Sequence, residues 1–275
     1  MTTTNIDVVA ADPLTERVRA TWTTGDFGRI AKGYERGAGE FVARLRLGVG
    51  ELVLDVATGT GNLAIPAARG GAFVTGVDIA GNLIEQARVN AGHEGLEIKF
   101  DVGDAEQLSY ADGAFDTVVT MFGAMFAARP ERAAAELIRV TRSGGRVAMA
   151  NWTPTGFIGE MFRIVGRHAP PPSGTPSPIL WGSEPDVRAR LTTGVTSLTL
   201  TPRTITFEYP FSAAETVDLF LRYYGPTVRA LASLDDNAQR TLREDLEALW
   251  SDNNRETDGT TRVESEYLEV VAVVR

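Results

Sequence analysis

The stretch Val53-Leu54-Asp55-Val56-Ala57-Thr58-Gly59-Thr60-Gly61-Asn62 decides the fold of this 275-residue chain. An apolar run stops at an acid and continues into a turn of small residues with two glycines. The apolar part predicts a buried parallel strand over Leu52–Val56, and the glycines let the backbone turn sharply before a helix that begins near Asn62. Open α/β sheets bind their ligands at such strand ends, so the stretch predicts a ligand site at the tip of a strand.

The glycine spacing alone does not identify the ligand. The run Gly59–Ala64 also satisfies the loose G-x-G-x-x-G/A pattern of dinucleotide-binding folds, and a glycine turn between strand and helix can also serve only close packing. Asp55 argues against a dinucleotide, because a carboxylate repels a pyrophosphate but attracts ammonium and sulfonium charge. The acid therefore favours a cationic ligand.

The quoted stretch resembles the first motif of the class I S-adenosylmethionine (SAM) dependent methyltransferases. Ala57 stands where many members have glycine, a small-for-small change that we expect the loop to tolerate. Later segments resemble the following motifs in family order: Val74–Ile79 with Leu83–Arg88, Val102–Ala105, Phe115–Val119 and Arg142–Val147. The resemblance covers roughly Gly48 to Trp152 and is strongest to the ubiquinone and menaquinone C-methyltransferase branch (methyltransferase type 11).

Strand-like and helix-like patterns alternate through this region, which predicts a parallel sheet with helices on both faces. The predicted strands are Leu52–Val56, Phe73–Asp78, Ile98–Val102, Phe115–Met121 and Arg146–Asn151. The predicted helices are Asn62–Arg69, Leu83–Asn90 and Pro130–Thr141, with Gly70-Gly71, Gly92 and Gly144-Gly145 as stop signals.

Beyond Asn151 the pattern changes. A helix over Phe157–His168 runs into the proline-rich loop Pro170–Pro178, which fits neither regular helix nor central strand. Ser197–Tyr209 and Arg262–Val274 alternate like strands, and Ala213–Trp250 between them predicts two helices around residues 234–237. The resemblance maps these two strands onto the antiparallel pair that ends the family's sheet. The helices between them then form an insertion suited to be a lid.

The resemblance thus implies a Rossmann-like α/β fold with a mostly parallel seven-stranded sheet. Three parts are expected: an N-terminal helical cover over residues 1–47, a SAM-binding core over 48–152, and a C-terminal part over 153–275 that completes the sheet. The C-terminal part carries the helical insertion 213–250 as a substrate cover.

Composition and net charge limit the classes of partner and site that we expect for this chain. Hydrophobic residues make up 43% and charged residues 23%, ordinary values for a globular protein, and no apolar run is long enough to cross a bilayer. The net charge of −9 argues against nucleic acid as a partner, and the absence of cysteine with only two histidines argues against a metal site. The N-terminus lacks a secretory signal, so we expect a cytoplasmic protein, a monomer or homodimer, that acts on a small molecule.

Three strand ends supply the acids of the expected cofactor site. Asp78 follows the glycine turn by about twenty residues, where an acid can accept hydrogen bonds from the ribose hydroxyls; otherwise it is an exposed strand-end acid. Asp104 can accept from the adenine amino group, or it can cap a helix through the capping box Asp104–Gln107. The residues expected to bind SAM, whose product is S-adenosylhomocysteine, are Asp55, Ala57, Gly59, Gly61, Asp78, Ile79, Asp104, Ala105, Met121 and Phe27.

The acceptor side carries no diagnostic motif. Methyl transfer from a sulfonium is an in-line displacement that needs alignment and exclusion of water rather than a catalytic dyad, so no catalytic residue is assigned. The substrate candidates are Trp22, Phe126, Tyr223, Tyr224 and His168. Each has a structural alternative: the aromatic residues can anchor the N-terminal segment or the inserted helix on the core, and His168 can be a surface residue rather than a base.

The sequence therefore predicts SAM-dependent methylation of a small, partly apolar or aromatic molecule. A nicotinamide-dependent oxidoreductase shares the glycine turn, but Asp55 and Gly103-Asp104-Ala105 have no evident role in it. A non-catalytic SAM-binding protein is a second alternative. A nucleic-acid methyltransferase is disfavoured by the charge and by Thr120-Met121-Phe122-Gly123, where such enzymes carry an Asn/Asp-Pro-Pro-Tyr/Phe type of motif.

Overall fold

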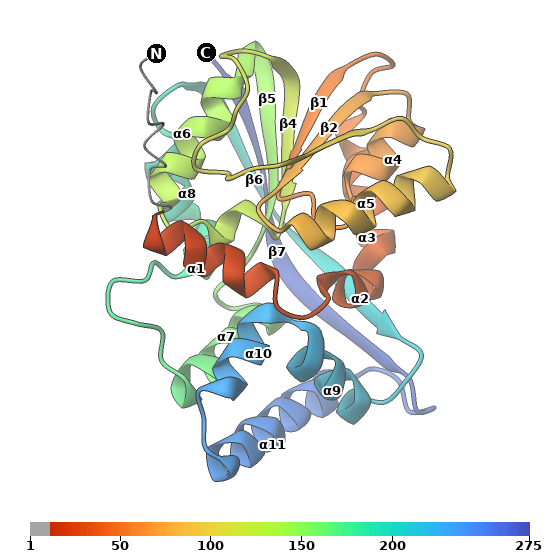
Figure 1. The fold of residues 1–275 in the computed structure, drawn as a ribbon, viewed down its shortest axis with the longest axis vertical. Coiled ribbons are helices and arrows are strands. Elements are labelled where there is room, and N and C mark those ends of the chain that lie inside the picture. The colour runs from red at the N-terminus through yellow and green to blue at the C-terminus, as the bar shows by residue number, and fades with distance from the viewer. Residues whose placement is uncertain (1–11) are drawn as a thin grey trace, which may run out of the picture.

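One seven-stranded sheet in the order β3-β2-β1-β4-β5-β7-β6 organises the molecule (Figure 1). The computed structural model describes residues 12–275. Only β7 runs against its neighbours β5 and β6, so the predicted mostly parallel α/β sheet is confirmed. The strands are β1 (Leu52–Val56), β2 (Phe73–Asp78), β3 (Lys99–Val102), β4 (Phe115–Met121), β5 (Thr141–Trp152), β6 (Val195–Tyr209) and β7 (Thr261–Val274).

Strand β1 lies in the middle of the parallel part, between β2 and β4. Its residues Val53, Leu54 and Val56 are completely buried. Both faces of such a strand are covered by helices, which explains why its sequence is a continuous apolar run rather than an alternating one.

The helices lie in two layers against the sheet and in a third group beyond the carboxyl ends of the parallel strands (Figure 1). Helices α4 and α5 cover one face, and α6 and α8 cover the other. The helices of the core are α3 (Glu35–Leu45), α4 (Ala64–Arg69), α5 (Gly81–His93), α6 (Pro130–Val140) and α8 (Glu184–Leu191). Beyond the strand ends lie α1 (Pro13–Trp22), α2 (Phe27–Ala31), α7 (Phe157–His168), α9 (Ala213–Tyr223), α10 (Gly225–Ala232) and α11 (Asp236–Asn253).

The insertion between β6 and β7 contains three helices, not the predicted two. The break before α11 lies where the sequence indicates it, because the Asp235 side chain caps the helix by accepting from the Ala238 amide at 2.8 Å. The missed break is at Gly225, which begins α10. A Cβ atom at Gly225 would lie 2.1 Å from the carbonyl oxygen of Thr21, so glycine there lets α10 pack closely against the end of α1.

Two of the predicted glycine stop signals are wrong. Helix α5 continues through Gly92 to His93, and the residue with the left-handed backbone is Gly95, at φ +66°. Helix α6 ends at Val140 and β5 begins at the next residue, so Gly144-Gly145 lies within the strand. The pairing of β5 with β4 shifts register there, which accommodates the glycine turn as an irregularity in the strand.

Two elements after the proline-rich loop were not predicted. A short 3₁₀ helix over Pro178–Gly182 precedes α8, which packs on α6. A Cβ atom at Gly182 would lie 2.0 Å from the carbonyl oxygen of Trp152, so this glycine allows the turn to sit directly on the end of β5. The sequence lacks a strong helix signal here because α8 has no clear apolar stripe.

Helix α1 lies across the carboxyl ends of the parallel strands, between the core and the group formed by α7, α9, α10 and α11 (Figure 1). None of its side chains is fully buried. The Asp12 side chain caps it by accepting from the Leu14 amide at 2.9 Å and also pairs with Arg129. Helix α1 is therefore a cover held on the surface rather than a part of the core.

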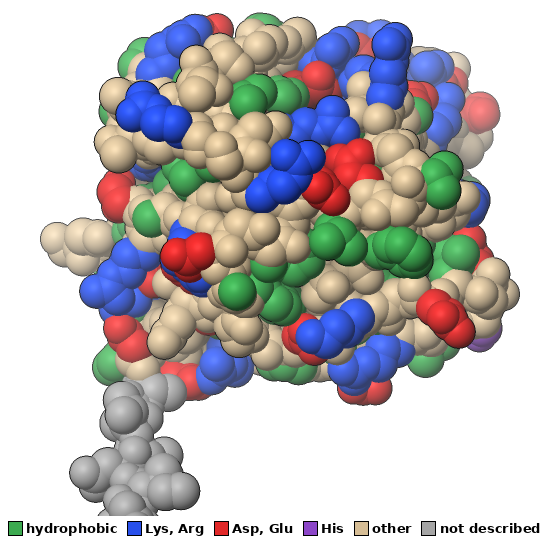
Figure 2. All heavy atoms as spheres, turned by 90° about the horizontal axis from the view of Figure 1, so that it is seen from above, with side chains coloured by type: hydrophobic (Ala, Val, Ile, Leu, Met, Phe, Trp, Pro, Cys, Tyr) green, Lys and Arg blue, Asp and Glu red, His purple; other side chains and the backbone are tan. Residues whose placement is uncertain are grey.

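The opposite end of the sheet carries mixed charge. Figure 2, a view of that end, shows Lys and Arg side chains interspersed with Asp and Glu. At the amino ends of the strands, Arg146 pairs with Glu51 at 3.2 Å and Arg142 pairs with Asp116 at 2.5 Å. Across residues 12–275, the helices are too short or too polar to form a membrane span.

The loop after β1 contains a backbone conformation that glycine usually supplies. Ala57 has φ +57°, in the left-handed region. Its methyl group is accommodated because the facing residue is Gly123, where a Cβ atom would lie 2.4 Å from the Ala57 Cβ. The alanine and the facing glycine are thus a complementary pair.

We expect Gly123→Ala to lower the free energy of unfolding by about 1–3 kcal/mol, because its new methyl group overlaps that of Ala57. Ala57→Gly should restore part of that loss in the double variant, since it removes the overlapping atom. Urea denaturation of the two single variants and the double variant measures the coupling. Strictly additive changes would show that the two residues do not share this space.

Candidate functional site

A cleft lies at the carboxyl ends of the parallel strands, under α1. The loops that follow β1, β2, β3 and β4 form its walls, as expected for an open α/β sheet. Eight of the ten residues expected at the cofactor line this cleft: Phe27, Ala57, Gly59, Asp78, Ile79, Asp104, Ala105 and Met121.

The buried side chain of Asp55 holds the glycine loop through hydrogen bonds. Its side chain is 1% exposed, and its Oδ2 accepts hydrogen bonds from Thr58 Oγ1 at 2.6 Å and from the Ala64 amide at 3.0 Å. These bonds tie the end of β1 to the turn and to the first residue of α4. Asp55 lines not the main cleft but a smaller neighbouring cavity, and its Oδ1 has no hydrogen-bond partner within residues 12–275.

Asp78 joins the loop after β1 to the loop after β2. Its Oδ2 accepts from the Gly59 amide at 2.9 Å, and its Oδ1 accepts from the Ala80 amide at 2.8 Å. The residue is 6% exposed and faces the cleft. Each carboxylate oxygen can accept a further hydrogen bond, so Asp78 can hold the loops and also receive two donors from a ligand.

Asp104 forms a turn rather than a helix cap. Its Oδ1 accepts from the Glu106 amide at 2.9 Å, and its carbonyl oxygen accepts from the Gln107 amide at 3.0 Å. No helix follows, so the alternative of a capping box at Asp104–Gln107 is wrong. The Oδ2 atom accepts from Thr15 Oγ1 at 3.2 Å, which connects α1 to the cleft.

The two buried acids of the loop have raised pKa values. Burial raises the pKa of Asp55 to about 7, while its bonds from Thr58 and Ala64 lower it and the neighbouring charge of Asp78 raises it. Burial likewise raises the pKa of Asp78 to about 6, against the lowering effect of backbone hydrogen bonds from Ala80, Gly59 and Ile79. A cation or a set of donors at this end of the cleft would favour the ionised forms.

Gly61 lies away from the cleft. It has φ +92° and lines a surface groove, and a Cβ atom there would lie 3.0 Å from Ile65. Its role is therefore the turn itself and the close packing of the loop on α4.

Aromatic side chains form the wall of the cleft that faces the helical cover. Trp22 is their centre, with ring centroids 5.4 Å from Phe27, 4.9 Å from Phe126 and 5.9 Å from Tyr224. Trp22, Phe27 and Phe126 line the cleft itself. Tyr224 lies behind them, in an inner cavity.

Two of the substrate candidates, Tyr223 and His168, line neither the cleft nor the inner cavity. The Tyr223 ring lies under the guanidinium group of Arg29, 4.7 Å from its centroid. His168 Nε2 lies 2.8 Å from Asp245 Oδ2 and joins α7 to α11. The structure thus gives both residues contacts within the helical cover, and we leave them out of the proposed site.

Sequence reasoning missed several residues around the cleft. Thr15 and Val18 reach it from α1, and Tyr34 lines the two smaller cavities. Asp12 and Pro13 mark the start of α1 in the sequence. Tyr34 has no local signal, because its position depends on how the N-terminal segment folds back on the sheet.

Comparisons with known proteins identify the family. A family model described as a methyltransferase domain matches residues 54–149. An uncharacterised protein of Mycobacterium tuberculosis is 36% identical over 260 residues, 94% of each chain. The demethylmenaquinone methyltransferase of Thermus thermophilus is 40% identical over 96 residues, 34% of this chain and 44% of its own. The chain belongs to the class I SAM-dependent methyltransferases.

Two solved structures have folds similar to the fold of this chain. The YcgJ protein from Bacillus subtilis has a TM-score of 0.59 at 17% identity, covering 87% of this chain and 98% of its own. The phosphoethanolamine N-methyltransferase 2 of Haemonchus contortus, solved with phosphomonomethylethanolamine and S-adenosylhomocysteine, has a TM-score of 0.55 at 17% identity. It is matched over 87% of this chain and 52% of its own.

The residues of this methyltransferase fit SAM. The unpaired Oδ1 of Asp55 suits an ammonium group, and the free acceptor capacity of Asp78 suits the two ribose hydroxyls. Ile79, Ala105 and Met121 add apolar surface to the same cleft. The acids and the apolar surface match a ligand that combines an amino acid with an adenosine.

We expect this methyltransferase to bind S-adenosylhomocysteine more tightly as the pH rises from 5 to 7. Burial raises the pKa of Asp78 to about 6, so raising the pH ionises a carboxylate that would accept the ligand's hydroxyl donors, and ionisation of Asp55 would shift the affinity in the same direction. One pH unit below the pKa about a tenth of Asp78 is ionised, so Asp78 alone should lower the affinity at pH 5 by up to about tenfold. Calorimetry across this range measures the effect. Asp78→Asn should flatten the profile; an unchanged profile in that variant would contradict the assignment.

Proposed function

We propose that the protein transfers the methyl group of SAM to a small, neutral, apolar or aromatic acceptor. The observation that carries the proposal is the division of the cleft: acids lie on the side of the strand ends, and aromatic rings face the helical cover. The acids suit the polar donor molecule, and the rings suit an acceptor that lacks charge.

The adenosine end of the donor would lie at Asp78, Ile79, Asp104 and Ala105. Asp78 would accept from the ribose, Asp104 would accept from the adenine amino group, and Ile79 would pack on the adenine face. The residues proposed for the methionine end are Asp55, Ala57, Gly59, Met121 and Phe27. Phe27 lines the main cleft and the small cavity of Asp55, which puts it beside the expected path of the methionine end.

SAM, when bound, supplies an electrophilic methyl group on a sulfonium. The chain's own residues align the two reactants and exclude water, which is the main demand of an in-line displacement. Helix α1 covers the cleft through the bond between Thr15 and Asp104 and through the ion pair between Asp12 and Arg129. Arg129 is in turn held by Glu106 at 2.8 Å, so the cover is attached to the loop after β3.

A ring acceptor also agrees with one similar protein. The relative from Thermus thermophilus is named for methylation of demethylmenaquinone. That similarity covers 34% of this chain, so the acceptor has to be argued from this chain's own aromatic residues.

We expect Asp78→Ala to weaken the binding of S-adenosylhomocysteine by about 10- to 100-fold, because it removes a charged acceptor of two hydrogen bonds. Calorimetry gives the affinity, and circular dichroism checks the fold. Asp78→Asn is the matched control, since it keeps the shape and one acceptor oxygen and should lose less.

Unchanged affinity in a folded Asp78→Ala protein would reject the ribose assignment. The same titrations should include NAD(H): tight nicotinamide binding without a response to SAM or S-adenosylhomocysteine would overturn the proposed function. A protein that binds SAM but transfers no methyl group to any neutral aromatic compound would favour the binding-only alternative.

A further inference from the structure

The loop after β3 borders the cleft and contains a turn but no helix or strand. We call residues 103–108 the β3 loop; residues 103–106 line the cleft. Asp104 shapes the turn, because its Oδ1 accepts from the Glu106 amide at 2.9 Å and its carbonyl oxygen accepts from the Gln107 amide at 3.0 Å. A loop of this kind needs contacts with its surroundings to keep one conformation.

The two ends of the β3 loop are held by the core. The Gly103 amide donates to the Asp78 carbonyl oxygen at 2.9 Å. At the other end, the Leu108 amide donates to Glu136 Oε2 at 2.7 Å, and the Leu108 carbonyl oxygen accepts from Arg139 Nη2 at 2.9 Å. The middle of the loop, which faces the cleft, needs attachments of its own.

Arg129 holds the middle of the β3 loop through Glu106. The Arg129 amide donates to Glu106 Oε1 and the Arg129 Nη1 donates to Glu106 Oε2, both at 2.8 Å. Two donors from one residue fix both the position and the orientation of the carboxylate. The other bond to this part of the loop, from Thr15 to Asp104 at 3.2 Å, is a single contact from a helix without buried side chains. Arg129 is therefore the firmer attachment.

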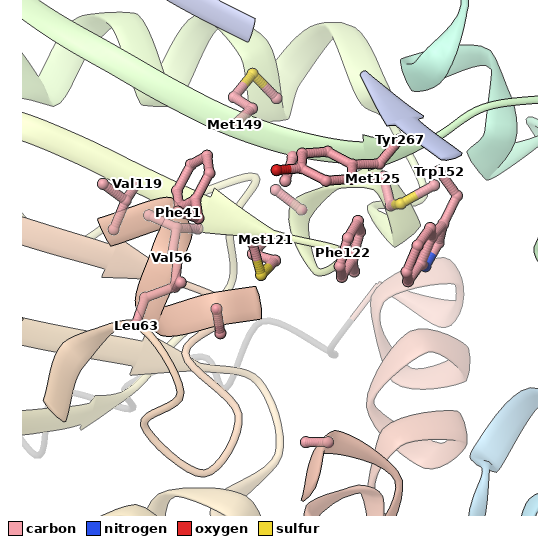
Figure 3. Close-up of a cluster of buried hydrophobic side chains, with 14 of the residues drawn as sticks. Phe41, Val56, Leu63, Val119, Met121, Phe122, Met125, Met149, Trp152 and Tyr267 are labelled. Carbon is pink, nitrogen blue, oxygen red and sulfur yellow. The ribbon is translucent and has the colours of Figure 1, made fainter. Parts of the chain in front are cut away.

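Arg129 itself projects from a packed part of the core. It lies between the loop after β4 and the first residue of α6. In that loop, the Phe122 ring stacks on Trp152 with centroids 3.4 Å apart and meets the Tyr267 ring edge-on at 5.7 Å (Figure 3). Met125 belongs to the same cluster and is 2% exposed. The packing of the core thus determines where the guanidinium group lies, and with it the middle of the β3 loop.

Loss of Arg129 would leave a carboxylate without its cation. The Glu106 side chain is only 5% exposed, and a buried charge without a partner is costly. No Lys or Arg of the described chain lines the cleft, so the released carboxylate would find no replacement there. The β3 loop would therefore move until water reached Glu106.

We propose that Arg129 is a positioning residue of this methyltransferase: through Glu106 it holds the β3 loop in the conformation in which Asp104 and Ala105 receive the adenine of SAM. Arg129 is not among the residues that line the cleft, so its effect on binding is indirect. The placement of the adenine rests on the proposed function, whereas the hold on the loop can be measured without a ligand.

The test combines calorimetric titration with S-adenosylhomocysteine and amide hydrogen exchange of the ligand-free whole protein. Arg129→Gln should weaken binding by about tenfold, because a freed loop has to be ordered again when the ligand binds. The amides of residues 103–108 should exchange faster in this variant. Arg129→Lys keeps a cation and should lose less affinity than Arg129→Gln. Circular dichroism checks that each variant is folded.

A second substitution should rescue part of the loss. In the double variant Arg129→Gln/Glu106→Gln the uncompensated charge is gone, and the two amide side chains can still form a hydrogen bond. We expect it to bind S-adenosylhomocysteine about threefold or more tighter than Arg129→Gln alone. Two merely structural losses would instead add.

Two controls separate this role from general stability and from the cover. Arg146→Gln removes an arginine of similar burial, 30% exposed against 25% for Arg129, whose partner Glu51 lies at the opposite end of the sheet. It should leave the affinity for S-adenosylhomocysteine unchanged. Asp12→Asn removes the charge that pairs Arg129 with α1 but keeps the contact with Glu106, so it should leave the exchange of residues 103–108 unchanged.

Three results would overturn the proposal: a folded Arg129→Gln protein with wild-type affinity and exchange, an equal loss of affinity in Arg146→Gln, or a double variant that binds no better than Arg129→Gln. Equal loosening of the β3 loop in Asp12→Asn would also overturn it, because the effect would then come through α1. If the wild-type protein does not bind S-adenosylhomocysteine, the proposed function fails. Hydrogen exchange then decides the hold on the loop: faster exchange in Arg129→Gln supports it, and unchanged exchange overturns it.

Discussion

The carboxylate of Asp78 is the contact on which the rest of the site depends. Its Oδ2 accepts a hydrogen bond from the Gly59 amide in the loop after β1, at 2.9 Å. Its Oδ1 accepts one from the Ala80 amide in the loop after β2, at 2.8 Å. Two strand ends are thereby held in one arrangement before any ligand arrives, and Asp55 fixes the same loop from below. Burying two acids this close raises their pKa values, so the loop is held by groups that a cationic, donor-rich ligand would also stabilise.

This arrangement determines where the backbone must be unusual. With the loop held between β1 and β2, Ala57 takes a left-handed conformation, and Gly123 leaves room for its methyl group. The loop after the neighbouring strand β4 carries another residue with a left-handed backbone, Phe122, whose ring lines both the cleft and the inner cavity. Ala57 and Phe122 thus follow the neighbouring strands β1 and β4, and both line the cleft.

Much of the core could be predicted from the sequence because its signals are local. The apolar runs of β1, β2 and β4 are bounded by acids and glycines, and the predicted ends of these strands match the structure. Gly92 and Gly144-Gly145 misled because a glycine can lie within a helix or within a strand irregularity when tertiary packing requires it. The hydrogen bonds of Asp55 within the loop and the position of Tyr34 could not be predicted, since both depend on which segments the fold brings together.

The cover formed by α1 has a thermodynamic consequence. No side chain of α1 is fully buried. The helix is attached by the polar contacts of Thr15 with Asp104 and of Asp12 with Arg129, and by the packing of the Trp22 ring on its aromatic neighbours. Such an element opens at a lower free energy than the sheet beneath it. Thr15, Val18 and Trp22 also line the cleft, so a ligand in the cleft and a closed α1 stabilise each other to the same extent. Binding of a ligand in the cleft should therefore increase the order of α1, and any change that loosens α1 should weaken ligand binding.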